Sequence, residues 1–285
     1  MPSRNGLNSP STLVFNGAPR TGAMTATVTR TATVGTVTDP NKDPEGWNFV
    51  ANAYPSPMRF SDFYALNSNV IENSVYIWDP AANAYIHFSN GVSSPAGYTD
   101  YIPAYQGFYV RVKNIGTYTL NFNNSIRVTD PGQATSPFYK TTTKHLMRLE
   151  FSNQVFVNET VVNFDDNATA NFDSEHDAHY LFSEDANAIE VASQLSSGVL
   201  AINSLPKPIL GGVTMIPLMF ESKTNGLHTV NLKEFSNFGM NDIVYLVDHK
   251  LGITHNLNSG DYTFSHATSD APGRFELHLF AGMLC

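Results

Sequence analysis

Cysteine, charge and long apolar runs are all scarce in this sequence. Cys285 is its only cysteine, so neither a disulfide framework nor a cysteine-based metal site can form within the chain. Charged residues make up 14% of the 285 residues, and 25 acidic side chains outnumber 16 basic ones, for a net charge of −9. Such a chain has no basic patch to displace counterions, so we expect no nucleic-acid partner. The longest nearly apolar stretch, 211–220, has about half the length of a membrane-spanning helix, so we expect no membrane insertion.

The first residues lack the apolar region of a signal peptide. Residues 1–6 read MPSRNG, with no run of apolar side chains. The low Lys and Glu content and the many Asn, Thr and Tyr residues nevertheless suit a secreted bacterial β-protein. We therefore expect the chain to be a fragment of a longer reading frame whose full-length product is secreted or held at the cell surface.

Short strand patterns dominate the chain, and no stretch shows a sustained helical period. One pair, 75–79 and 84–88, alternates around a turn and predicts a hairpin, and residues 61–66 predict one or two helical turns. About nine further strands follow a Pro- and Gly-rich linker at 130–137. These patterns predict an all-β fold of two β-sandwich (jelly-roll-like) domains in tandem. The predicted units are an N-terminal hairpin segment at 1–45 (strands 12–15 and 24–37) that joins the first domain, a first sandwich at 46–132 and a second at 138–280.

Several sequence blocks, in order, resemble one family. They are GWNFVANAYPSP at 46–57, VYIWD at 75–79, IPAYQGFYV at 102–110, the segment 164–181, YTF at 262–264 and RFEL at 274–277. Together they resemble the β-region that precedes the C-terminal sorting domain of the type IX (Por) secretion system in surface and secreted proteins of Bacteroidota. The resemblance covers roughly residues 10–280 and implies export and attachment to the cell surface. It implies no common chemistry, and the sorting domain expected after about residue 280 is absent from this chain.

An acidic segment at 165–177 is the densest polar cluster. Calcium prefers six to eight oxygen ligands from carboxylates, amides and carbonyls, and crowded carboxylates repel one another unless a cation neutralises them. The segment therefore predicts a calcium site, although it lacks the spacing and central glycine of an EF-hand. In the alternative interpretation Asp173 caps a short helix and the other acids face water. The predicted ligands are Asp165, Asp166, Asn167, Asp173, Glu175 and Asp177.

Two histidines and three tyrosines complete the candidate residues. His176 and His179, with Asp177 between them, could bind zinc or act in catalysis. They match no established zinc-hydrolase pattern, so surface histidines are the favoured interpretation. Trp47 and Trp78 are expected in the core. A Gly- and Pro-rich loop offers a more exposed ligand surface, formed by Tyr98, Tyr101 and Tyr105.

Two functions remain open at this point. The first is a calcium-stabilised, secreted or cell-surface β-sandwich module that binds a glycan or a surface protein, or has a structural role. The second is a calcium- or metal-dependent secreted hydrolase that acts on an ester, lactone or glycan as its small-molecule substrate. We favour the binding module because the sequence holds no catalytic motif such as G-x-S-x-G.

Overall fold

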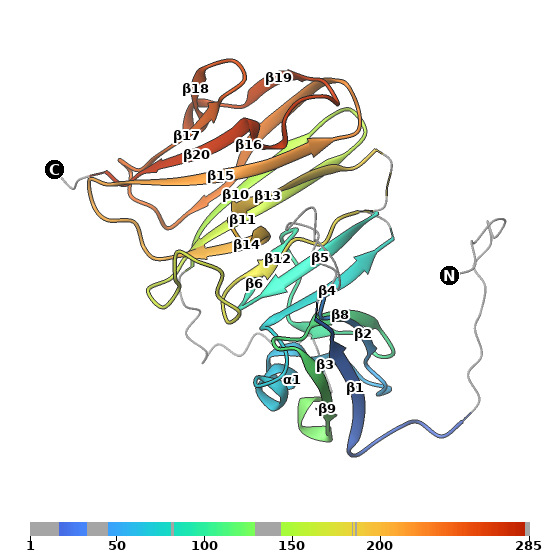
Figure 1. Ribbon diagram of the computed structural model, residues 1–285. Coiled ribbons are helices and arrows are strands. Elements are labelled where there is room, and N and C mark those ends of the chain that lie inside the picture. The colour runs from blue at the N-terminus through green and yellow to red at the C-terminus, as the bar shows by residue number, and fades with distance from the viewer. Residues whose placement is uncertain are drawn as a thin grey trace.

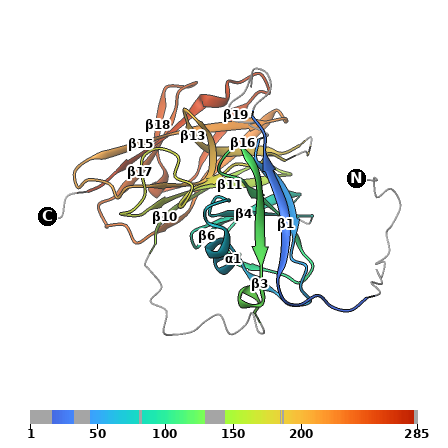
Figure 2. The same ribbon diagram turned by 60° about the horizontal axis from the view of Figure 1, so that its bottom comes forward.

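A computed structural model describes residues 17–32, 45–80, 83–128, 144–183, 185 and 187–282. The predicted all-β class is confirmed: within these residues the chain forms one 11-stranded sheet, one five-stranded sheet and two two-stranded sheets, with one short α-helix. The large sheet occupies one end of the molecule and the small sheets occupy the other (Figure 1). Figures 1 and 2 both place α1, β1 and β3 together, apart from β15, β17 and β18.

The small sheets come from residues before 123. The five-stranded sheet has the order β2-β8-β4-β5-β6, and β1 pairs with β9 and β3 with β7, all antiparallel. The elements are β1 (Met24–Arg30), β2 (Trp47–Ala51), β3 (Met58–Arg59), α1 (Phe60–Asn67), β4 (Ser74–Asp79), β5 (Ala84–Ser89), β6 (Val92–Ser94), β7 (Tyr101–Ile102), β8 (Gly107–Arg111), β9 (Gly116–Phe122) and the 3-10 helix η2 (Asn124–Ile126).

Helix α1 lies where residues 61–66 predict helical turns. Its buried side chains are Phe60, Phe63 and Asn67, which fall on one face because their spacing is three and four residues. Phe63 packs its ring 4.8 Å from that of Phe122. The Asn67 amide donates to the Asn121 carbonyl at 3.0 Å and accepts from the Asn121 N–H at 2.8 Å, so one side chain fixes the helix to β9.

The large sheet comes from residues after 144. Its order is β18-β17-β20-β15-β13-β14-β11-β10-β16-β19, with β12 added beside β14; β11 and β14 pair in parallel and the other neighbours antiparallel. The strands are β10 (His145–Ser152), β11 (Val157–Phe164), β12 (Ala178–His179), β13 (Ile189–Leu195), β14 (Gly198–Leu205), β15 (Val213–Ser222), β16 (Gly226–Ser236), β17 (Ile243–Asp248), β18 (Ile253–Asn256), β19 (Tyr262–His266) and β20 (Phe275–Phe280), with 3-10 helices η4 (Leu257–Ser259) and η5 (Pro272–Arg274).

The strands of the large sheet enclose one apolar core. Alternate residues of β10, β15 and β20 point inward, as the two-residue period of a strand requires. Phe220 on β15 lies at the centre, with ring centroids 5.3 Å from Phe151, 5.4 Å from Phe264 and 5.6 Å from Phe275. Strands far apart in the sheet therefore bury their side chains against one another, as a β-sandwich core requires.

The structure describes only part of the predicted N-terminal hairpin. Its first strand, 12–15, lies outside the described residues, as does the predicted linker at 130–137. Residues 24–30 of the predicted second strand (24–37) form β1, which pairs with β9, with Val28 opposite Tyr118. Residues 33–37 lie outside the described residues. The pairing fixes β1 to the small sheets through a strand about 90 residues further along the chain.

The two groups of sheets contact each other directly. The Asn73 N–H donates to the Ser174 carbonyl at 2.8 Å, and the Arg148 guanidinium donates to the Ser93 carbonyl at 2.9 Å. Tyr76 on β4 is fully buried in a small apolar cluster with residues of β11, β12 and β14. Polar and apolar contacts thus join the small sheets to the large one.

Candidate functional site

A cavity of about 470 Å³ opens at the junction between the small sheets and the large sheet. A volume of this size is within the range of small-molecule sites. Its walls come from β1, β2, β8 and β12, from the segment before β4 and from the acidic loop. The charged and aromatic side chains that line it are Arg30, Trp47, Glu72, Arg111, Lys113, Phe172, His179 and Tyr180.

Backbone pairing places Glu72 in the wall of this cavity. Ile71 bridges Val112, and the Glu72 N–H donates to the Arg111 carbonyl at 3.0 Å. The N–H of the next residue, Asn73, donates to the Ser174 carbonyl in the acidic loop. The segment 71–73 therefore passes between the two groups of sheets. Glu72 is 2% exposed and Arg111 5% exposed, which places both charges in the interior.

Glu72, Arg111 and His179 form one buried network. Nη1 of Arg111 lies 3.4 Å from Oε1 of Glu72 and donates to Nε2 of His179. The imidazole Nε2 therefore accepts, which fixes a neutral His179. Burial, with a further contribution from Arg111 and Arg30, holds the pKa of His179 well below its usual range. A neutral His179 is the protonation state that this contact with Arg111 requires.

The second carboxyl oxygen of Glu72 has no hydrogen-bond partner among the described residues. Oε2 is buried and lies 3.8 Å from Nε2 of His179, beyond hydrogen-bond distance. Burial raises the pKa of Glu72 to about 7, although Arg111, Arg30 and Lys113 each act in the opposite direction. A buried acceptor without a partner at a cavity wall is a position where a bound molecule can supply the missing donor.

Lys113 and the aromatic rings complete the cavity. The Lys113 ammonium donates to Glu175 at 2.7 Å and to the Ser68 carbonyl at 2.8 Å. Trp47 packs edge-on against Tyr76, with ring centroids 4.7 Å apart, and still lines the cavity. The expectation that Trp47 belongs to the core therefore describes only part of its environment. The Phe172 ring lies 4.3 Å from the His179 ring.

Two of the predicted calcium ligands form ion pairs with separate lysines. Oδ2 of Asp166 lies 2.6 Å from the Lys207 ammonium, and Oδ2 of Asp165 lies 3.8 Å from that of Lys144. Oδ1 of Asp165 also accepts from the Asn167 N–H at 3.0 Å. The local Asx turn and two lysines therefore relieve the repulsion between these adjacent carboxylates.

The remaining acids of the loop also have contacts of their own. Oδ1 of Asp173 accepts from the Glu175 N–H at 3.0 Å, and Glu175 pairs with Lys113. Asp173 thus caps a turn, which agrees in part with the capping interpretation. In the part of the chain that the structure describes, no group of three or more His, Cys, Asp or Glu side chains is placed to hold a metal ion. The calcium site stays a prediction.

Asp177 is the buried member of the loop. Its two carboxyl oxygens accept from the Ser204 N–H and the Asp173 N–H, both at 2.7 Å, and burial raises its pKa to about 7. His176 makes its contact elsewhere, with Nδ1 2.8 Å from the Asn90 amide. Of the three weak catalytic candidates, the structure places His179 in the cavity, while Asp177 and His176 anchor the loop.

The three tyrosines proposed for ligand binding lie away from this cavity. Tyr98 and Tyr101 line a smaller, mainly apolar cavity of about 230 Å³ beside β4 and β5. The Tyr98 hydroxyl donates to Asp79 at 2.9 Å, and the Tyr101 hydroxyl accepts from Arg59 at 2.9 Å. Tyr105 is 60% exposed at a turn. The loop therefore places two of the three rings together.

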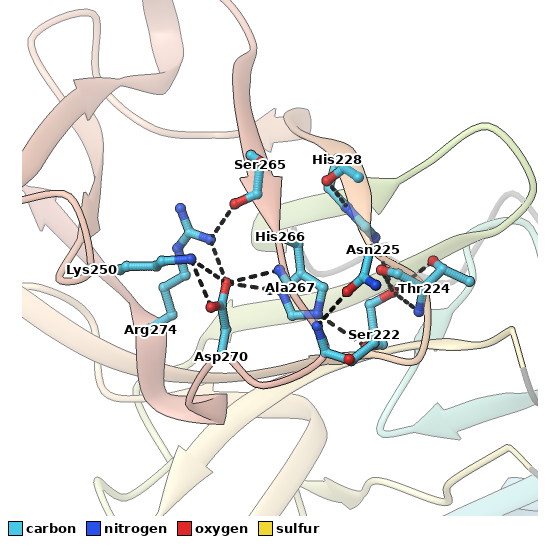
Figure 3. Close-up of polar contacts among 12 residues, drawn as sticks. Ser222, Thr224, Asn225, His228, Lys250, Ser265, His266, Ala267, Asp270 and Arg274 are labelled. Carbon is cyan, nitrogen blue, oxygen red and sulfur yellow. Dashed lines mark hydrogen bonds and ion pairs between the residues drawn. The ribbon is translucent and has the colours of Figure 1, made fainter.

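A second polar cluster lies around the turn between β15 and β16 (Figure 3). Oγ of Ser222 lies 3.0 Å from Nε2 of His228, whose Nδ1 donates to the Gly226 carbonyl at 3.1 Å. The Asp270 carboxylate faces His266, 3.4 Å from its Nδ1, rather than His228. The Ser222 hydroxyl and the Asp270 carboxylate thus contact different imidazoles, while the Ser222 carbonyl lies 3.0 Å from Nε2 of His266. The cluster ties the 222–226 turn to the loop after β19.

Sequence reasoning missed Glu72, Arg111, Lys113 and Arg30. A signal for the first two was present. Arg111 stands between Val110 and Val112 in a run of buried strand residues, and Glu72 follows Val70 and Ile71 directly. A single charge within an apolar segment indicates a buried, partnered group more often than a solvated one.

The fold and the cavity define an all-β protein with a cation-rich, small-molecule-sized cavity between its sheets. The family described as "Domain of unknown function (DUF8693)" matches this sequence over residues 1–91 and 79–279, and the chain belongs to that family. Searches among curated proteins and among solved structures gave no match. Within the described residues no helix is long and apolar enough to cross a membrane.

Proposed function

We propose that this protein is a secreted or cell-surface binding module that holds a glycan in the cavity between its sheets. The observation that carries the proposal is the composition of the cavity wall: charged hydrogen-bonding groups beside the rings of Trp47 and Phe172. Sugars offer hydroxyl groups for such polar contacts and flat C–H faces for aromatic rings. A small number of fixed polar groups beside aromatic walls is typical of ligand sites.

The resemblance to the β-region of type IX secreted proteins supports an exported, surface-attached module. The Asn-, Thr- and Tyr-rich strands fit the same proposal. The proposed ligand is a free or surface glycan. If no glycan binds, a surface protein or another small molecule becomes the favoured ligand.

Titration of the purified protein with a panel of oligosaccharides, followed by tryptophan fluorescence, tests the glycan proposal. Trp47 reports directly because it lines the cavity. Phe172→Ala, which removes a wall ring from a loop, should weaken binding at least tenfold. Phe280→Ala is the matched control, because Phe280 is 40% exposed on β20 of the large sheet and does not line this cavity. Equal loss in both variants, or no fluorescence change with any saccharide, would refute the proposal.

A secreted hydrolase acting on an ester, lactone or glycan is the second candidate. One observation favours it: burial raises the pKa of Glu72 to about 7, a value suited to a general acid at neutral pH. Glu72 is, however, the one carboxylic acid among the described residues of the wall, whereas most glycosidases use two. Hydrolysis of simple esters, lactones and oligosaccharides, with and without EDTA, separates the candidates; turnover that is lost in Glu72→Gln would displace the binding module.

Calcium stabilisation of residues 165–177 is a separate proposal. It rests on the density of acids there, of which Asp166 is 70% exposed at its side chain. A melting scan with EDTA, followed by added Ca²⁺, tests it. A midpoint that falls with EDTA and recovers with Ca²⁺ supports a shared ion, and an unchanged midpoint rules it out.

A further inference from the structure

We propose that the ligand of the junction cavity is an acidic sugar, whose carboxylate lies among Arg30, Arg111 and Lys113 and whose hydroxyl group donates to Oε2 of Glu72. This inference rests on the proposed function and names the chemical class of its ligand. It also assigns to each side of the cavity a separate part of that ligand.

The charge of the cavity differs in sign from that of the chain. Three of the 16 basic residues line this one cavity, in a protein with a net charge of −9. All three cations act to lower the pKa of Glu72, so their positive charges all act on the same carboxyl group in the cavity wall. Two of them, Arg111 and Arg30, also contribute to the lowered pKa of His179. A positive potential at a concave, low-dielectric wall attracts an anionic ligand.

Backbone contacts hold the cationic groups in place. The Arg30 guanidinium donates to the Val112 carbonyl at 3.0 Å and to the Lys113 carbonyl at 3.2 Å. The Arg111 guanidinium lies over the Trp47 ring, with Cζ 5.8 Å from the ring centroid. The cations therefore converge on the short segment 111–113, and little side-chain freedom is lost when a carboxylate binds there.

Glu72 supplies the preference for a hydroxyl group. Glu72 lines the cavity, and its buried Oε2 atom has no hydrogen-bond partner in the described structure. When Glu72 is ionised, a hydroxyl or amine of a ligand can donate to this oxygen, whereas a simple inorganic anion that lacks a proton cannot. One ligand that satisfies both sides carries a carboxylate and hydroxyl groups on the same small ring. A uronic acid has this chemistry, and the rings of Trp47 and Phe172 can face its C–H groups.

Calorimetric titration with a digalacturonate and with the matching neutral galactose disaccharide tests this inference. We expect the acidic disaccharide to bind at least tenfold more tightly than the neutral one, with an affinity that falls as salt is raised. Sulfate alone and galacturonic acid monomer are included to separate a general anion site from one that also needs the hydroxyl groups. Galacturonate should bind more tightly than sulfate.

Lys113→Gln removes one cation from the wall and should weaken digalacturonate at least fivefold while changing the neutral disaccharide little. Lys207→Gln is the matched control, because Lys207 also pairs with one acid but lies outside the cavity; it should leave both affinities unchanged. Arg30→Gln provides a second test if Lys113→Gln does not fold.

The outcomes separate this inference from the proposed function. Equal affinity for the acidic and neutral disaccharides, with both lost in Phe172→Ala, would refute the acidic ligand and keep the glycan module. Sulfate that binds as tightly as galacturonate would refute the role of Glu72. Failure of every saccharide to bind would refute both proposals.

Discussion

Glu72→Gln should make the stability of the protein less dependent on pH, and in a direction that the structure fixes. The Glu72 carboxyl is 2% exposed, and burial raises its pKa from the ordinary value of 4.5 to about 7. Between these two pH values the folded chain keeps the proton and the unfolded chain has released it. The free energy of unfolding therefore falls as pH rises through this interval, since the folded state binds more protons.

The size of the effect follows from the two pKa values. The interval from 4.5 to about 7 corresponds to about 3 kcal/mol for this one group. Glutamine keeps the shape of the side chain but cannot titrate, so this contribution disappears in the variant. At each pH, the free energy of unfolding of Glu72→Gln is compared with that of the unsubstituted protein. Relative to that protein, the variant should be about 2–3 kcal/mol more stable at pH 8 than it is at pH 5. Any cost in packing is present at both pH values and cancels in this comparison.

Urea unfolding curves of both proteins at pH 5 and pH 8 measure this difference. Other buried groups, including His87 with its pKa lowered to about 4 by burial, titrate in both proteins and cancel as well. Glu190→Gln is a positive control, because burial also raises the pKa of Glu190 to about 7. Asp62→Asn, at a side chain 46% exposed on α1, is the negative control. A difference below about 1 kcal/mol for Glu72→Gln, or one of opposite sign, would refute a buried carboxyl of this kind.

Three further substitutions probe contacts that hold the sheets and loops. Arg274→Met should lower the free energy of unfolding in urea by about 3–5 kcal/mol, because it leaves the buried Asp248 carboxylate without its cation. The two oxygens of Asp248, whose side chain is 1% exposed, accept from Arg274 at 2.9 and 2.6 Å. The double variant with Asp248→Asn should lose less stability than the two single variants together. Asp177→Ala should lower stability by about 2–4 kcal/mol, since it leaves one buried and one part-buried backbone N–H group without an acceptor. Asn67→Ala should lower the thermal midpoint by about 4–10 °C, because its side chain joins α1 to β9. A cost below about 1 kcal/mol for any of these would contradict the contact concerned.

Local pattern was enough to predict strands but not their distant partners. The hairpin of 75–79 with 84–88 is found as β4 and β5, with Ile77 opposite Ile86, because alternation and a positive φ at Asn83 are both encoded within fifteen residues. A strand over 24–37 was also predicted, with a partner at 12–15 that lies outside the described residues. Within the described residues, 24–30 pairs with β9. Contacts of high sequence separation depend on the whole fold, and no local period specifies them.

The candidate site shows the same division. The density of acids along the chain predicted a calcium site at 165–177, yet an exposed acid there such as Asp166 pairs with a lysine. The network of the cavity joins Glu72, Arg111 and His179, which stand tens of residues apart, and only His179 was a candidate. A single charge within an apolar segment does not form a recognisable motif in a sequence. Because such a charge is buried, however, it needs partners that only the folded structure shows.

The position of the cavity has a consequence for how the two groups of sheets act together. Its walls come from residues up to 114 and from 172 onward, so neither group alone encloses it. The two stretches of the family match, 1–91 and 79–279, likewise extend over both groups. A ligand held between Lys113 and Phe172 gains its binding energy only while both groups are folded and docked. Saturating ligand should therefore raise the stability of the small and large sheets together, by an amount set by its concentration relative to its dissociation constant.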